Sequence, residues 1–282
     1  MNKNIIGKTR AIVPDIKRLD SNYLKQVVKR LIRSLLGPSL FETLWSVRKF
    51  VVKKVPNVNI YMDHIADKSG IEIGGPSTVF DLQLPIYKKI RSLDGVNFSS
   101  STMWEGQLKS GNTYSFSKNK KGFQFLCDGT ELNNIKDSSY DFCVSSNCLE
   151  HIANPLKALT EWKRILKDSG CLILVLPNKK HNFDHNRPIT KFEHLLRDYN
   201  HNTSERDLAC LDEVLELHDL SLDLPAGNFE NFKARCMDNY NNRGLHHHVF
   251  DLGLMVEMVE FLDFKCVQKC EWGRDFFMLA VK

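Results

Sequence analysis

The feature that most limits the fold of this chain is an alternation of short apolar strands with helices, which begins at residue 70. The strand predicted at 171–176 has six consecutive apolar residues without polar alternation, as expected for a strand covered on both faces. Four further strands are predicted, at 70–73, 95–98, 123–127 and 140–144. Strands that alternate with helices indicate an α/β fold with a mostly parallel sheet and helices on both faces.

Capping residues and apolar periodicity predict the helices between these strands. Asn154 followed by Pro155 begins one helix, and Gly170 is expected to end it. Asp251 can cap another helix near the end of the chain. A further helix is expected after the first strand, at about 79–90.

The last two predicted strands, at 264–269 and 276–281, are separated by six residues. A parallel crossover needs a dozen or more residues, so these two strands should form an antiparallel hairpin.

Charge is distributed unevenly along the chain. Residues 1–54 contain 13 Lys or Arg and 3 Asp or Glu, whereas residues 55–282 contain 26 and 31. Apolar residues at helical spacing in 20–54 predict helices with basic outer faces. We therefore interpret 1–56 as a basic helical extension and 57–282 as the main domain. The extension either packs on the domain or contacts an anionic membrane surface or acidic partner.

Several classes of protein are disfavoured by composition. The chain is 42% hydrophobic and 26% charged, which is unlike a disordered chain, and it lacks a run long enough to span a membrane. No CxxC pair supports a zinc ribbon, and few aromatic residues accompany the basic ones, so nucleic acid is not an expected partner. With no visible secretory signal, we expect a cytoplasmic protein, at the inner membrane surface if the extension contacts lipid.

Polar residues and glycines follow the carboxyl ends of the predicted strands, where open α/β sheets bind their ligands. The first strand leads into a turn with two glycines, which lets the backbone approach a ligand closely. A polar side chain after the second strand can reach a ribose, and a carboxylate after the third can accept from an exocyclic amine. In chain order, these features are Glu72 with Gly74-Gly75-Pro76-Ser77, then Asn97, Asp128-Gly129 and Ser145-Ser146.

These motifs resemble those of the class I S-adenosylmethionine-dependent methyltransferases, and most of all the type 11 group. IEIGGPS is similar to the first motif of that group, CDGTEL to its adenine-contacting motif, and the block from YDFCV to LVLPN to its central strand-helix-strand unit. The resemblance covers residues 70–176 well. It implies a Rossmann-like, mostly parallel seven-stranded sheet with the antiparallel C-terminal hairpin. It also implies S-adenosylmethionine as cofactor and S-adenosylhomocysteine as product.

The resemblance assigns roles to the residues at the strand ends. The methionine part of the cofactor would be held by the turn of Glu72, Gly74, Gly75, Pro76 and Ser77. The ribose would be bound by Asn97, and the adenine by Asp128 and Gly129. The sulfonium side would be lined by Ser145 and Ser146. Pro76 stands where the family usually has a second glycine, and Asn97 where an acidic residue is usual; Glu105 could replace Asn97. His151 is interpreted as structural, with a catalytic role left open.

A long insertion follows the fifth predicted strand. Residues 178–248 contain eight of the ten histidines, and long insertions at this edge often build binding surfaces or lids. We predict an acceptor-binding insertion or lid. A base for methyl transfer could come from His181, Asp184 or His185, and the acceptor could be bound by Arg187, His218, Asp219 and His247.

The same insertion contains candidate metal ligands. His246 and His248 would share one face of an extended chain, and His181 with His185 could add ligands. No standard zinc signature matches, so no metal is predicted.

The function predicted from these patterns is O-methylation. The EIGGPS turn and the FDHNRP segment resemble bacterial methyltransferases associated with capsule and surface-polysaccharide biosynthesis, which implies a sugar, nucleotide-sugar or phosphoryl-type acceptor. Two alternatives remain: a small-molecule N-methyltransferase, and a non-catalytic binding protein in which Pro76 and Asn97 weaken cofactor binding. The oligomeric state is not predicted.

Overall fold

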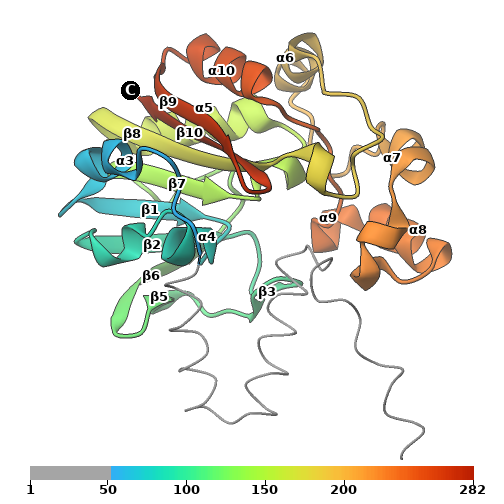
Figure 1. Cartoon of the computed structure of the whole chain (residues 1–282). Coiled ribbons are helices and arrows are strands. Elements are labelled where there is room, and N and C mark those ends of the chain that lie inside the picture. Colours follow the sequence, from blue (N-terminus) through green and yellow to red (C-terminus); the bar gives the residue numbers. More distant parts are fainter. Residues whose placement is uncertain (1–51) are drawn as a thin grey trace, which may run out of the picture.

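The computed structural model describes residues 52–282, and its centre is one eight-stranded sheet with the order β5-β6-β2-β1-β7-β8-β10-β9 (Figure 1). The parallel part consists of β6 (Lys120–Leu126), β2 (Ser92–Asn97), β1 (Ser69–Ile73), β7 (Tyr140–Ser146) and β8 (Leu166–Pro177). The chain runs outward from β1 to β6 and then returns to β7, so the strand order reverses between β1 and β7. In open α/β sheets, ligands bind at such a reversal.

The predicted C-terminal hairpin is confirmed. β9 (Lys265–Trp272) pairs antiparallel with β10 (Asp275–Val281), which in turn lies antiparallel beside β8. The mostly parallel Rossmann-like sheet expected from the resemblance is therefore present.

The prediction of seven strands was one too few. β5 (Gly111–Ser117) adds an antiparallel edge strand beside β6, and a separate two-stranded ribbon joins β3 (Ser101–Thr102) and β4 (Gly106–Gln107). In β5 only Tyr114 and Phe116 are buried, and the other residues are small or polar. An edge strand with one covered side gives a weak apolar signal, which is why the sequence did not reveal it.

Helices cover both faces of the sheet (Figure 1). One face is covered by α5 (Pro155–Ile165) and α10 (Leu252–Phe261), and the other by α3 (Val58–Ile65) and α4 (Val79–Leu82). Two predicted caps are confirmed, since Asn154 accepts from the Lys157 amide at 3.0 Å and Asp251 from the Leu254 amide at 2.8 Å.

Two predicted helix boundaries were wrong. The helix expected at 79–90 is reduced to α4 and a 3₁₀ turn at Ile86–Lys88, because Pro85 lies between them and cannot continue an α-helix. The helix that begins at Pro155 ends at Ile165 rather than at Gly170, because β8 already begins at Leu166.

The side chains of β8 from Cys171 to Leu176 show why this part of the strand is apolar. Leu172 and Leu174 face the core layer beneath α5 and α10, whereas Ile173 and Val175 face the layer beneath α3 and α4. Both layers exclude water, so every position from Cys171 to Leu176 buries apolar surface.

The segment predicted as an insertion contains α6 (Phe192–Asn200), α7 (Leu211–Leu217), α8 (Phe229–Met237) and α9 (Asn239–Asn242). It has a small apolar core of its own, formed by Val214, Ala226, Phe232, Cys236 and Leu245. The segment therefore holds its shape partly by its own packing.

The predicted basic extension and its membrane contact lie almost wholly in residues 1–51, outside the described residues. They remain predictions. Among residues 52–282, no helix combines the length and apolar character needed to cross a membrane.

Candidate active site

The turn after β1 requires glycine at two successive positions. Gly74 has a φ of +80°, and a Cβ there would lie 2.6 Å from the sulfur of Cys148. A Cβ on Gly75 would lie 2.2 Å from a carboxylate oxygen of Glu72. The turn is therefore closely packed against both β1 and the segment after β7, and its backbone forms the surface at the strand reversal.

Glu72 lies beneath this turn and is completely buried. Its carboxylate accepts hydrogen bonds from the Ser77 amide at 2.9 Å, the Tyr87 hydroxyl at 2.7 Å and the Tyr114 hydroxyl at 2.6 Å. Burial raises the pKa of Glu72 from 4.5 to about 7, although these hydrogen bonds act in the opposite direction. The carboxyl group thus supports the turn from the protein side.

This raised pKa predicts a pH-dependent stability. Between about pH 4.5 and 7 the folded chain binds more protons than the unfolded chain, so the stabilisation is present at low pH and is lost as the pH rises through 7. The loss is expected to be roughly 3 kcal/mol. We expect Glu72→Gln to remove this decline in urea unfolding measured from pH 5 to 8. The exposed Glu216→Gln should keep it, and an unchanged slope in Glu72→Gln would contradict the assignment.

Asn97 and Asp128 lie beside the turn, each in contact with protein groups. The Asn97 amide donates to the carbonyl of Gly75 at 3.0 Å. Asp128 accepts from the amide and hydroxyl of Thr130 and, at 2.9 Å, from Arg243. Asn97 therefore holds the turn, and Arg243 links the insertion to the predicted adenine position.

Two polar atoms at the end of β7 lack a partner. The Ser145 hydroxyl donates to the carbonyl of Ile73 at 3.0 Å, but Ser146 Oγ and Asn147 Oδ1 are buried without a hydrogen bond. Buried polar groups are normally paired, so these atoms point to a bound polar group. Together with the glycine turn, they fit a cofactor such as S-adenosylmethionine.

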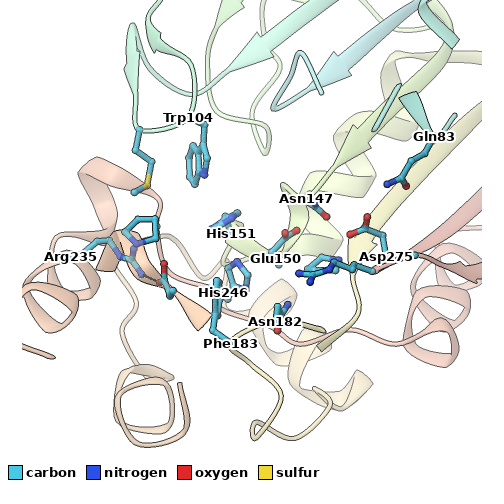
Figure 2. A pocket seen from close by; sticks show the side chains of 17 residues that line it. Gln83, Trp104, Asn147, Glu150, His151, Asn182, Phe183, Arg235, His246 and Asp275 are labelled. Carbon is cyan, nitrogen blue, oxygen red and sulfur yellow. Dashed lines mark hydrogen bonds and ion pairs between the residues drawn. The ribbon is translucent and has the colours of Figure 1, made fainter. Parts of the chain in front are cut away.

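A cavity of about 210 Å³ lies beyond the carboxyl ends of β7 and β8, between the sheet and the insertion (Figure 2). Most of its lining side chains are polar or charged, and two of them, Trp104 and Phe183, are aromatic. The polar members include Asn147, Glu150, His151, Asn182, Asp223, Arg235, His246 and Asp275.

At the centre of this lining lie Glu150, His151 and His246 (Figure 2). His246 donates through Nδ1 to Asp184 at 2.5 Å, and His151 donates through Nδ1 to the carbonyl of Leu245 at 3.2 Å. Burial raises the pKa of Glu150 to about 7 and lowers that of His151 well below its usual value. Burial acts to lower the pKa of His246 as well, but the carboxylate of Asp184 outweighs it and raises that pKa.

Residues 93–174 match the family model described as a methyltransferase domain. The part of the chain that forms β2, β7 and the segment after β7 is therefore similar to a methyltransferase domain. The matched residues are less than a third of the chain, and they run from β2 through the cavity-lining segment after β7 into β8.

Comparison with individual proteins gives more distant likenesses. A curated protein of Methanocaldococcus jannaschii is 52% identical over 45 residues, which are 16% of this chain and 20% of that protein, so the match spans a fifth of the relative's length. A methyltransferase structure from Methanosarcina mazei is 16% identical and covers 81% of this chain and 98% of its own, with a TM-score of 0.44. A methyltransferase structure from Mesorhizobium loti is 10% identical and covers 80% of this chain and 96% of its own, with a TM-score of 0.48.

Of the predicted catalytic residues, only Asp184 contacts the central cluster, through His246. It is buried and accepts from His246 and, at 2.9 Å, from Arg187. Burial alone would raise the pKa of Asp184, but its interactions with His246 and Arg187 hold it well below its usual value. His181 and His185 are exposed instead, and His185 pairs with Asp219 at 3.0 Å.

Arg187, predicted to bind the acceptor, is buried among protein groups. Its guanidinium donates to Asp184, to Glu213 and to the carbonyl of His246, all at 2.9 Å. It therefore positions the Asp184–His246 pair and does not line the cavity.

The other predicted acceptor residues are also held elsewhere. His218 lies 3.2 Å from Asp223 and stacks on Phe183, rather than pairing with its neighbour Asp219. His247 contacts the side-chain amide of Asn239 at 3.0 Å. Successive residues of a chain point in different directions, so His218 and Asp219 do not form the pair that their adjacency suggested.

The site residues predicted from the sequence do not include Glu150 and His246, which lie at the centre of the cavity lining. Glu150 directly precedes His151 in the segment after β7, and His246 begins the run of three histidines. Their proximity depends on a contact between distant segments.

Proposed function

We propose that this methyltransferase transfers a methyl group to a hydroxyl oxygen of a small, polar, sugar-type acceptor. The observation that carries the proposal is the polar cavity at the end of β7, with Glu150, His151 and His246 at its centre. A sugar or nucleotide-linked sugar of surface-polysaccharide synthesis agrees with the resemblance of the FDHNRP segment.

The residues of the strand reversal would hold the cofactor. Gly74 and Gly75 pack the turn against Cys148 and Glu72, which fixes its backbone at the strand reversal, and Ser146 with Asn147 offers two unpaired polar atoms. S-adenosylmethionine, when bound, supplies a methyl group on a positively charged sulfur.

The cavity lining supports binding of a polyhydroxylated ring. Trp104 and Phe183 offer flat apolar faces, against which the C–H face of a sugar can pack. Asn182, Asp223 and Arg235 offer donors and acceptors for hydroxyl groups. Fixing the ring between these groups would orient one hydroxyl oxygen for direct displacement, which accounts for much of the catalysis in such reactions.

The reacting hydroxyl must lose its proton as the new carbon–oxygen bond forms. Glu150, His151 and His246 are the carboxylate and imidazole groups that meet at one point of the cavity. One of these groups would accept the proton of the acceptor hydroxyl, which lowers the energy of the transition state at neutral pH. Asp184 and Arg187 hold His246 in place for that task.

A panel of acceptors tests the proposal. The enzyme is incubated with S-adenosylmethionine and UDP-, GDP- or CDP-linked sugars, or with primary amines as the comparison set. S-adenosylhomocysteine formation and mass spectrometry follow the product. We expect an O-methylated sugar from at least one nucleotide sugar; methylation confined to the nitrogen of the amines would contradict O-methylation.

A further inference from the structure

Glu150, His151 and His246 have the donor set and spacing of a metal site. Each offers one ligand atom, and these atoms all lie within 4.8 Å of one another. Two imidazoles and one carboxylate are a common ligand set for divalent transition metals that keep open positions for a substrate. In Figure 2 the three side chains converge within the cavity lining.

The hydrogen bonds around the two imidazoles leave the same nitrogen available in each. His246 uses Nδ1 to donate to Asp184, and His151 uses Nδ1 to donate to the carbonyl of Leu245. Nε2 of each ring is then the nitrogen that can present a lone pair. Histidines that bind metals almost always donate their other ring N–H to a carboxylate or a backbone carbonyl, and both arrangements occur here.

One oxygen of the cluster's carboxylate is unpaired. Glu150 is 1% exposed, and its Oε2 atom is buried without a hydrogen-bond partner. Burial makes an unpaired negative charge costly. A cation at this point would compensate the charge and pair the orphaned oxygen.

We propose that Glu150, His151 and His246 bind a divalent transition-metal ion at the floor of the acceptor cavity. The imidazole ligands favour ions of the Mn²⁺, Fe²⁺, Co²⁺ and Zn²⁺ class over Mg²⁺ and Ca²⁺, which prefer oxygen ligands. The open coordination positions would face the cavity and bind the acceptor's hydroxyl oxygen, lowering the pKa of that hydroxyl. This role rests on the proposed function, whereas the metal site itself does not.

A second set of three possible metal ligands serves as a control for the proposed site. His194, Asp198 and His248 also bring three ligand atoms together. His248, however, uses Nε2 to donate to the carbonyl of Ala153 at 3.1 Å, and Nε2 is the nitrogen that lies 3.7 Å from Asp198. That nitrogen carries a proton and cannot ligate. His194→Ala is therefore the control for the site at Glu150.

The test uses Co²⁺ as probe. The full-length protein is dialysed against chelator, loaded with Co²⁺ and freed of excess ion; bound cobalt is then measured by elemental analysis and by its visible absorption. We expect about one equivalent per chain, with the spectrum of a histidine-ligated site. Retention below about one tenth of an equivalent would overturn the proposal.

Variants locate the ion. Glu150→Gln keeps the shape of the side chain and removes its charge, and it should weaken Co²⁺ binding by about 100-fold, whereas His194→Ala should bind as the wild type does. Circular dichroism checks folding, and His246→Gln provides a second variant with the same expectation. Wild-type Co²⁺ affinity in both Glu150→Gln and His246→Gln would overturn the assignment of the site.

The metal site and the proposed function can fail separately. If chelator-treated enzyme fails to retain added Co²⁺ but still methylates a hydroxyl group at an unchanged rate, the metal site is wrong and the proposed function stands. If Co²⁺ is retained at Glu150 but the acceptor panel gives only N-methylated products, the O-methylation proposal is wrong and the site stands.

Discussion

Gly74→Ala is expected to weaken S-adenosylmethionine binding by about 100-fold, or about 3 kcal/mol. Two costs combine at this position. The φ of +80° is unfavourable for alanine, and the new Cβ would lie 2.6 Å from the sulfur of Cys148. The turn must therefore shift away from the segment after β7, and its backbone would leave the position in which it meets the cofactor. Isothermal titration calorimetry of the variant measures the change.

Gly111→Ala is the matched control. Gly111 also has a positive φ, of +110°, but a Cβ there would meet nothing within 4 Å, and the residue lies on the edge strand β5. We expect a lower free energy of unfolding from the unfavourable φ, and cofactor affinity within about twofold of wild type. Equal affinity in both variants would show that the turn at Gly74 does not hold the cofactor.

His246→Gln is expected to lower kcat by about 10²- to 10⁴-fold on an acceptor identified from the panel. The variant removes the imidazole that Asp184 orients within the central cluster, and glutamine can neither take up a proton nor replace it as a good metal ligand. The cofactor turn is formed by other residues, so the Kd for S-adenosylmethionine should stay within about twofold. Steady-state kinetics and calorimetry on the same preparation separate the two effects.

His185→Gln provides the comparison for this variant. His185 is an insertion histidine of the same FDHNRP segment as Asp184, but it is exposed and pairs with Asp219 outside the cavity. Its replacement should change kcat by less than about twofold, since an exposed pair contributes little. A large loss of activity in His185→Gln with none in His246→Gln would move the active site away from the cavity.

The sheet was predictable because its parallel strands are covered on both faces. At β8 this requires an apolar side chain at every position from Cys171 to Leu176, and the requirement is visible in the sequence. The caps Asn154 and Asp251 act on amides three residues away, so they too are local signals. The edge strand β5 has one covered side and small polar residues, and it left no comparable pattern.

The candidate site was predictable only where it depends on local sequence. The glycine turn at Gly74 was predictable because it directly follows the first apolar strand in the sequence. The structure shows why glycine is needed there, since a Cβ would lie too close to Cys148. The pair Asp184–His246 joins residues 62 positions apart, and its formation depends on how the insertion packs. Local reasoning therefore chose His185 in place of His246, although both histidines lie in the predicted insertion.

The central claim is that the turn at the end of β1 and the unpaired atoms at the end of β7 bind S-adenosylmethionine. Calorimetric titration of the wild-type protein with S-adenosylmethionine, and separately with S-adenosylhomocysteine, tests it most directly. We predict one site per chain with a Kd on the order of micromolar for both. Absence of binding by either compound at millimolar concentration would contradict the claim.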